Sequence, residues 1–304
     1  MSILLGLVLT VFLFLIGISL VLFVIGPGML LQPQRRTVSY YRGRTSLLHP
    51  RDIDVLCEEV TLKTAEGFEL SCWLIKVTGK PRGTIVHLHG VSESKIVGLP
   101  LATRLFDRGY NVFLYDSRRH GDSGGTYCTY GFYEKHDAST AITYLQSRKD
   151  LHMGRVGLFG SSMGAAVALQ VAAMDSRVEA VVAESGFATL RTIFDDYQKR
   201  MIKLPWHYLR NIVIRRSERL AHFKASAVSP LEAVKQIHVP LFILHGTEDR
   251  LIKCSYSQML YESANEPKQL WLVRNAEHSN MADVGGEEYY RRVLEFFDEA
   301  LQVR

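Results

Sequence analysis

A serine flanked by glycines lies near the middle of this chain, where a short apolar run gives way to a longer one. Residues 160–164 (GSSMG) fit the pattern G-x-S-x-G, follow directly on the apolar residues 156–159, and precede the small apolar residues 165–173. A strand, G-x-S-x-G and a helix in succession form the context of a nucleophile elbow, whose sharp turn exposes a serine hydroxyl. Ser162 is therefore a candidate nucleophile. The alternative is a Gly- and Ser-rich turn without chemistry, because the pattern alone is a weak signal.

A serine nucleophile needs a general base and a carboxylate that orients the base. Residues 240–245 (PLFILH) predict a buried strand, and Asp249 follows in the loop at its carboxyl end. Residues 269–273 predict the next strand, and His278 follows that one. Ligand sites of open α/β sheets form at this edge. The chain order Ser162, Asp249, His278 is also the order expected after a nucleophile elbow.

Other residues of the same types are weaker candidates. Glu248 is the alternative orienting acid, directly beside Asp249. The remaining histidines that we considered as bases lie within or at the ends of predicted strands, before the elbow strand, or in a helical insertion: His87, His89, His245, His152, His207 and His222.

Hydrolysis through a serine also needs N–H donors for the oxyanion of the tetrahedral intermediate. The backbone N–H of Met163 directly follows the nucleophile and lies at a predicted helix N-terminus, where the helix dipole assists. The second donor is expected from the loop after the strand 84–89, where Gly90 permits a close turn. We assign it to the backbone N–H of Val91. The alternative is that this loop merely ends a strand.

The elements that must position these residues alternate between strands and helices. The predicted strands are residues 55–62, 67–77, 84–89, 111–115, 155–159, 178–183, 239–245 and 269–273. The predicted helices of the body are residues 99–108, 134–147, 165–173, 255–264 and 287–301. This alternation predicts an α/β fold, an eight-stranded and mostly parallel sheet with helices on both faces, whose first two strands form a hairpin.

One stretch, about residues 186–237, breaks the alternation. It carries helical runs at 189–201 and 206–223, and the segment 191–224 holds nine Lys/Arg against three Asp/Glu. We interpret it as a helical lid over the carboxyl ends of the strands, and the alternative is a solvated helical excursion without a role. Its basic character and its aromatic residues Trp206, Tyr208 and Phe223 suggest a face toward anionic headgroups.

The N-terminal run 3–25 contains no charged residue and is long enough to span a hydrocarbon core of roughly 30 Å. A signal peptide is the alternative. Against it, the run has no preceding Lys or Arg, is longer than an ordinary apolar signal region, and is followed by no A-x-A cleavage pattern. We therefore predict an uncleaved transmembrane anchor over residues 1–31.

Four arginines (Arg35, Arg36, Arg42 and Arg44) follow the apolar run in a basic connector, residues 32–54. The positive-inside rule then places the body, residues 55–304, in the cytoplasm and predicts a single-pass protein of the cell (inner) membrane. The opposite orientation would put the body outside the cell.

The four scattered cysteines lack C-x-x-C spacing, which argues against a disulfide framework or a zinc site. The dispersed net charge of +5 does not suggest nucleic-acid binding.

Taken together, several motifs resemble the α/β-hydrolase superfamily, and most of all bacterial membrane-anchored serine hydrolases of the serine aminopeptidase or prolyl-oligopeptidase-like kind. The motifs are His89-Gly90, residues 115–123 (YDSRRHGDS), the elbow, residues 245–249 (HGTED) and Glu277-His278. The resemblance covers about residues 55–301. It implies a serine hydrolase with a lid between strands six and seven and a mainly structural role for residues 116–123.

These observations lead to a function hypothesis. The chain is expected to be a membrane-anchored hydrolase of a carboxylic ester, including a lipid-like acyl ester, that acts through an acyl-enzyme on Ser162. No metal or organic cofactor is implied. A serine peptidase or aminopeptidase with the same triad is the second interpretation. A non-catalytic binding protein on the same fold is the third, because fold alone does not fix function.

Overall fold

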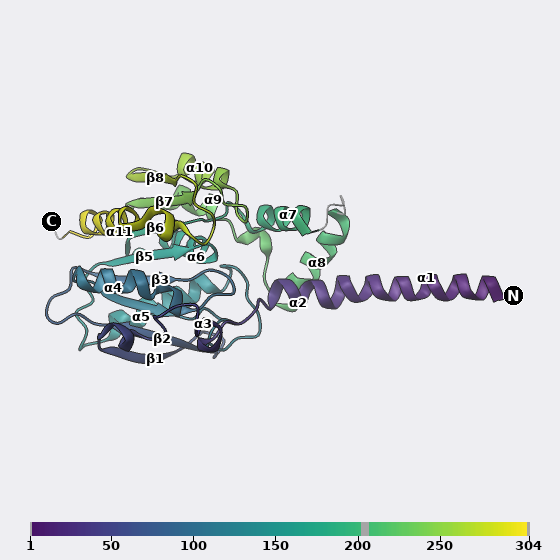
Figure 1. Ribbon diagram of the computed structural model, residues 1–304, viewed down its shortest axis with the longest axis horizontal. Coiled ribbons are helices and arrows are strands. Elements are labelled where there is room, and N and C mark those ends of the chain that lie inside the picture. Colours follow the sequence, from purple (N-terminus) through teal and green to yellow (C-terminus); the bar gives the residue numbers. More distant parts are fainter. Residues whose placement is uncertain (1, 202–206, 303–304) are drawn as a thin grey trace.

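The computed structural model describes residues 2–201 and 207–302, and its centre is an eight-stranded sheet (Figure 1). The strands follow the order β1-β2-β4-β3-β5-β6-β7-β8 across the sheet. β2 pairs antiparallel with both of its neighbours, and all the pairs from β4 to β8 are parallel. The strands are β1 (Cys57–Lys63), β2 (Glu69–Ile75), β3 (Thr84–Leu88), β4 (Asn111–Tyr115), β5 (Val156–Ser161), β6 (Val178–Glu184), β7 (Leu241–Gly246) and β8 (Lys268–Val273). The predicted sheet and its opening hairpin are confirmed.

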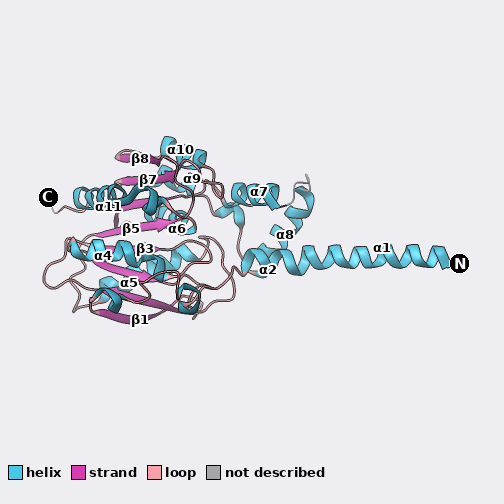
Figure 2. Cartoon of the chain, in the orientation of Figure 1, coloured by secondary structure: helices cyan, strands magenta, loops and turns pink. Residues whose placement is uncertain are grey.

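Helices lie on both faces of this sheet, as Figure 2 shows. Successive side chains of a strand point to opposite faces, so neighbouring residues of β5 join different cores. Leu158 packs in the core beneath α5, α6 and α10, whereas Phe159 packs in the core beneath α4 and α11. The described helices of the body are α3 (Val38–Tyr41), α4 (Leu99–Asp107), α5 (Glu134–Ser147), α6 (Met163–Met174), α7 (Leu190–Met201), α8 (His207–Leu220), α9 (Pro230–Ala233), α10 (Cys254–Ser263) and α11 (Met281–Ala300).

Some predicted boundaries are wrong. α6 begins at Met163, directly after the serine, rather than at residue 165. α11 begins at Met281 rather than at residue 287 and bends at Gly286, whose φ of 52° and ψ of −139° are not helical. Glycine is a weak helix former, so the apolar period did not extend the predicted helix across Gly285 and Gly286. The predicted run 206–223 is α8, shorter at its carboxyl end, and Trp206 lies outside the described residues.

The predicted insertion occupies the segment between β6 and β7 and contains α7 and α8. Figure 1 shows both helices beyond the carboxyl ends of the strands, on the side from which the N-terminal helix projects. Phe187, Phe194 and Phe223 are buried in a third apolar cluster that also includes Met163. The insertion is therefore packed onto the body at the edge of the sheet that carries the elbow.

The N-terminal helix consists of α1 (Ser2–Leu20), a π-helical turn η1 (Val21–Ile25) and α2 (Gly26–Leu31). Its residues Ile3–Leu31 form a run of 29 with a mean hydropathy of 3.1 in the most apolar window, of which only 6% is buried. An apolar helix that is exposed on nearly every side is typical of a membrane span rather than of a core helix. The helix is thus long and apolar enough to cross a membrane.

The last turn of this helix is built into the body. Leu31 is 1% exposed and lies in the same apolar cluster as Phe194 and Ile214 of the insertion. The backbone N–H of Cys128 donates to the carbonyl of Leu31 at 2.8 Å. Arg35 donates to the carbonyl of Ser123 at 2.6 Å. These contacts join the predicted anchor and connector to the body, and they fix the point at which the N-terminal helix leaves it.

Candidate active site

The strand-to-helix turn at Ser162 has the strained geometry that the sequence predicts. Ser162 has φ 55° and ψ −114°, a conformation that is costly for a residue with a Cβ. Its backbone N–H donates to the carbonyl of Glu184 at the end of β6 at 2.8 Å. A Cβ on Gly160 would stand 2.2 Å from the carbonyl oxygen of Gly164, and a Cβ on Gly164 would stand 1.9 Å from that of Leu88. Only glycine therefore fits at both flanks of the serine.

The structure brings Ser162, His278 and Asp249 together in one chain of hydrogen bonds. His278 Nδ1 lies 2.7 Å from Asp249 Oδ2, and His278 Nε2 lies 3.0 Å from Ser162 Oγ. Because an ionised carboxylate only accepts, Nδ1 carries the proton and Nε2 is left to accept the serine hydroxyl. Each residue follows its own strand, β5, β7 or β8, at the carboxyl edge of the sheet. This arrangement allows His278 to remove the proton of Ser162.

The Asp249 carboxylate is inaccessible to solvent and surrounded by donors. Its Oδ1 accepts the backbone N–H groups of Leu251 and Ile252, both at 2.8 Å, and His245 Nε2 lies 3.1 Å from Oδ2. Burial raises the pKa of Asp249, but the hydrogen bonds from His245, His278 and the backbone lower it by more, so the pKa lies below its usual range. The carboxylate therefore stays ionised. Glu248, the alternative acid, is exposed.

The two predicted oxyanion donors flank Ser162 from different elements. Met163 is the first residue of α6, and the first N–H groups of a helix have no acceptor within it. Val91 lines the same pocket as Ser162. A Cβ on Gly90 would lie 3.3 Å from the Cβ of Ser162, so the loop after β3 passes directly beside the serine. The backbone N–H of Gly90 itself donates to Glu93 Oε2 at 2.8 Å, which fixes that loop.

A pocket of about 370 Å³ opens above the serine. Its walls combine apolar side chains, such as Val97, Leu101 and Met281, with about as many polar ones. This volume lies within the range of about 300–1,000 Å³ that is usual for small-molecule sites. The pocket can hold both the acyl group and the leaving group of a small acyl compound beside the reacting hydroxyl.

Two carboxyl groups that the sequence analysis missed also line this pocket, Glu93 and Glu184. Glu184 accepts hydrogen bonds from Tyr289 at 2.5 Å and from Ser161 at 3.0 Å. Removal from bulk water raises the pKa of both carboxyl groups. Glu184 ends an apolar strand at the edge that carries the site, which was the signal that could have found it. Glu93 follows three residues after Gly90 and gave no comparable signal.

Two further pocket residues come from outside the core of the sheet, Arg36 of the connector and Tyr197 of α7. From its place in the sequence, Arg36 indicated only the orientation in the membrane. Tyr197 gave no signal, because its contact with the site depends on how the insertion folds back.

Buried histidines support the loop beside the serine. His89 accepts the backbone N–H of Ser117 at 2.9 Å through Nε2, and Nδ1 then donates to the carbonyl of Gly90 at 2.7 Å. His120 lies against it, with ring centroids 5.2 Å apart. Burial lowers the pKa of each to about 3, from an ordinary value of 6.5. Both imidazoles are therefore neutral supports of this loop.

These neutral histidines predict acid-dependent unfolding. Below pH 6.5 these two histidines bind protons in the unfolded chain, whereas in the folded chain they stay neutral down to about pH 3. The free energy of unfolding therefore falls as the pH falls. Each such group contributes about 1.4 kcal/mol per pH unit in that window. His120→Asn should reduce the slope between pH 6 and pH 4 by about that amount, as measured by urea unfolding followed by tryptophan fluorescence in detergent. The same change at the exposed His152 is the control, and an unchanged slope in His120→Asn would contradict the assignment.

Comparison with known proteins identifies the family and the fold of this chain. Residues 79–230 match the family model described as serine aminopeptidase, S33 (Hydrolase_4). The chain is 30% identical to the uncharacterized protein YqkD of Bacillus subtilis over 239 residues, which is 78% of each chain. It is 30% identical to the uncharacterized protein YfhR of Escherichia coli K12 over 291 residues, covering 93% of this chain and 95% of that one. Among solved structures it resembles the esterase Pf2001 of Pyrococcus furiosus, with a TM-score of 0.73, 28% identity, and coverage of 89% and 100%.

Proposed function

Because the chain belongs to the serine aminopeptidase, S33 family (Hydrolase_4) of α/β hydrolases, we propose that it is a membrane-anchored serine hydrolase of carboxylic esters. The observation that carries the proposal is the hydrogen-bonded chain from Ser162 through His278 to Asp249, at 3.0 Å and 2.7 Å. The similarity to a solved esterase supports an ester rather than another acyl compound. The exposed apolar N-terminal helix supports the anchor.

The mechanism follows from the positions of these groups. Ser162 Oγ attacks the carbonyl carbon of the ester while His278 Nε2 takes its proton. The backbone N–H groups of Val91 and Met163 stabilise the oxyanion, each contributing on the order of 3 kcal/mol to the transition state. His278 then returns the proton to the leaving alcohol, and an acyl group remains on Ser162. A water molecule activated by His278 releases the acid.

A serine aminopeptidase is the second candidate, and the two pocket carboxyl groups favour it. Glu93 and Glu184 line the pocket that holds Ser162, where an ionised carboxylate would pair with the α-ammonium of a peptide. The raised pKa of each group weighs the other way, because it favours the neutral acid.

One experiment separates the candidates. The full chain in detergent is treated with a fluorescent fluorophosphonate and assayed on 4-nitrophenyl esters of increasing chain length and on aminoacyl 4-nitroanilides. Labelling together with ester turnover supports the proposal. Preferential cleavage of the anilides would replace it with the aminopeptidase. A folded chain that neither labels nor turns over any substrate would move the third interpretation, a binding protein, to the front.

We further propose that the body faces the cytoplasm and that α8 meets anionic headgroups. Arg215 and Arg219 are exposed and lie four residues apart, on one face of α8. Arg210 instead forms an ion pair with Asp195. Each exposed arginine near an anionic surface contributes about 1 kcal/mol.

Reversal of these charges tests the contact. In the chain that lacks residues 1–25 but keeps α2, Arg215→Glu with Arg219→Glu should weaken binding to phosphatidylglycerol vesicles at least about tenfold, with little change on phosphatidylcholine. The comparison of the two lipids isolates the charge effect from apolar contacts. Lys80→Glu with Lys149→Glu, both exposed before strands at the far edge of the sheet, is the control. Equal losses in the two double variants would refute a specific α8 contact.

A further inference from the structure

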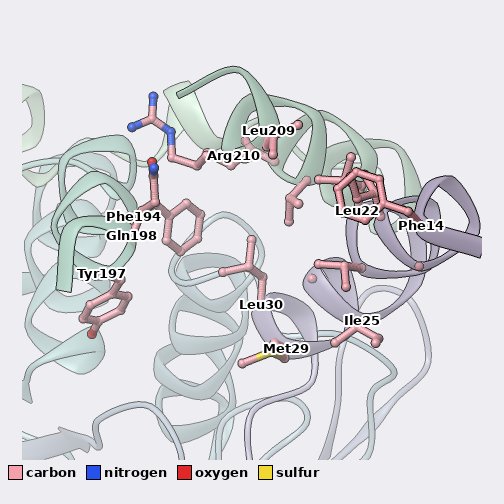
Figure 3. Close-up of a pocket in the computed structure, with 16 residues that line it drawn as sticks. Phe14, Leu22, Ile25, Met29, Leu30, Phe194, Tyr197, Gln198, Leu209 and Arg210 are labelled. Atoms are coloured by element: carbon pink, nitrogen blue, oxygen red, sulfur yellow. The ribbon is translucent and has the colours of Figure 1, made fainter. Parts of the chain in front are cut away.

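A second hollow, of about 580 Å³, lies between the N-terminal helix and the insertion (Figure 3). The helix contributes Phe14, Leu22 and Met29, and α7 and α8 contribute Phe194, Leu209 and Val213. Arg210 lies at its edge, and Figure 3 shows the guanidinium turned away from the interior. A hollow with such walls offers water too few polar partners and suits an apolar occupant.

The pairing of the two helices builds this hollow. At Gly26 the N-terminal helix touches α8 so closely that a Cβ there would stand 2.9 Å from a methyl group of Val213. At Gly17, also in the lining, a Cβ would meet no atom within 4 Å. The N-terminal helix and α8 are therefore in close contact at Gly26 and lie farther apart toward Gly17. Pro27 lacks an N–H and its ring crowds the preceding turn, which explains the π-helical turn Val21–Ile25 beside the contact.

The dimensions and surroundings of the hollow point to a bilayer lipid. From Phe14 to Met29 the lining extends over about 22 Å of helix, at roughly 1.5 Å per residue. One leaflet of a bilayer has a hydrocarbon depth of roughly half of 30 Å. The wall that carries these residues is the helix long and apolar enough to cross a membrane. The hollow is therefore longer than one leaflet is deep, has room for the whole length of an acyl chain of that leaflet, and matches such a chain in polarity and position.

The hollow also adjoins the candidate active site. Tyr197 lines both the hollow and the pocket that contains Ser162 and His278. Met163, which follows the serine, lies in the same apolar cluster as Leu31 and Phe194. Buried apolar packing therefore continues from the end of the N-terminal helix to the residue beside the nucleophile, and Tyr197 lies where the hollow and the pocket meet.

We propose that this hollow binds the acyl chain of an ester-bearing membrane lipid, which reaches Ser162 past Tyr197 from the bilayer. This inference rests on the proposed ester hydrolysis and adds the substrate class and the route of entry. The α1 helix then serves as one wall of the substrate site as well as an anchor.

Filling the hollow tests the inference on the full chain in phosphatidylcholine nanodiscs. Gly17→Trp has space for its ring, and Gly6→Trp is the matched control on the exposed part of the same helix, where a Cβ also meets no atom within 4 Å. The readout is the ratio of kcat/KM for 4-nitrophenyl hexadecanoate to that for the butanoate. We expect Gly17→Trp to lower this ratio at least about tenfold, the equivalent of two methylene groups no longer buried, and Gly6→Trp to leave it unchanged.

A binding measurement makes the result independent of turnover. In Ser162→Ala, a diazirine-bearing hexadecanoyl probe should crosslink to peptides that contain residues 14–30 and 190–214, and added Gly17→Trp should reduce that crosslinking. Unchanged ratios and no crosslinking at these peptides, with ester turnover intact, would overturn the lipid site but leave the hydrolase. If the native chain proves dimeric in nanodiscs, and Gly17→Trp is monomeric at an unchanged ratio, the hollow would belong to a second copy, which would also overturn the lipid site. Butanoate turnover that survives in Ser162→Ala would refute the proposed function itself.

Discussion

Replacing Ser162 with alanine should lower kcat/KM on every ester that the native chain cleaves by about 10⁴-fold or more. The hydroxyl is the group that His278 contacts at 3.0 Å, and alanine leaves no nucleophile at that position. The remaining activity would come from the oxyanion donors and from substrate binding. Labelling by a fluorophosphonate should disappear in the same variant, because the probe reacts with the same oxygen.

Ser161→Ala is the matched control for this experiment. Ser161 is the adjacent residue, and its hydroxyl donates to Glu184 at 3.0 Å rather than to His278. Loss of one hydrogen bond of this kind costs about 0.5–1.5 kcal/mol, so we expect a change of roughly tenfold at most and retained labelling. Loss of labelling in Ser161→Ala, with retention in Ser162→Ala, would exchange the two assignments.

Replacing Asp249 with asparagine should lower kcat by about 10⁴-fold with little change in KM. The carboxylate accepts the proton of His278 Nδ1 at 2.7 Å and so keeps Nε2 free for Ser162. An amide can turn its NH₂ toward Nδ1, which favours the tautomer with the proton on Nε2. The imidazole could then no longer act as the base.

The control for this variant is Glu248→Gln, which we expect to change kcat by less than about twofold because Glu248 is exposed. The pH profile adds a further check. The pKa of Asp249 lies below its usual range, so a fall in activity between pH 7 and pH 5 should not reflect protonation of Asp249. A large loss in Glu248→Gln, with activity retained in Asp249→Asn, would transfer the orienting role to Glu248.

Much of the fold and of the site could be predicted because the signals are local in sequence. A strand directly followed by G-x-S-x-G and a helix places Ser162 in a tight turn, whatever the rest of the chain does. Asp249 and His278 each follow an apolar run, and the carboxyl ends of parallel strands meet at one edge. Three separate local patterns therefore converge, and the structure brings the three side chains within hydrogen-bond distance.

Other parts of the site depend on packing between distant segments. His245 contacts the Asp249 carboxylate because β7 and its loop fold back on one another, whereas its sequence position indicated only a strand end. Arg36 and Tyr197 enter the pocket from the connector and from the insertion. The hydrophobic period of a sequence cannot predict such contacts, because they depend on how these segments lie over the sheet.

The sequence by itself determined that this chain has a mostly parallel sheet covered on both faces, a serine at a sharp turn, and an N-terminal helix apolar enough for a bilayer. These properties follow from residue type, period and order along the chain. Only the tertiary structure decided that α2 packs against α8, and that the N-terminal helix forms one wall of an apolar hollow that shares Tyr197 with the pocket of Ser162. The physical reason is that close packing, as at Gly26 and Val213, depends on the shapes of two surfaces that lie far apart in sequence.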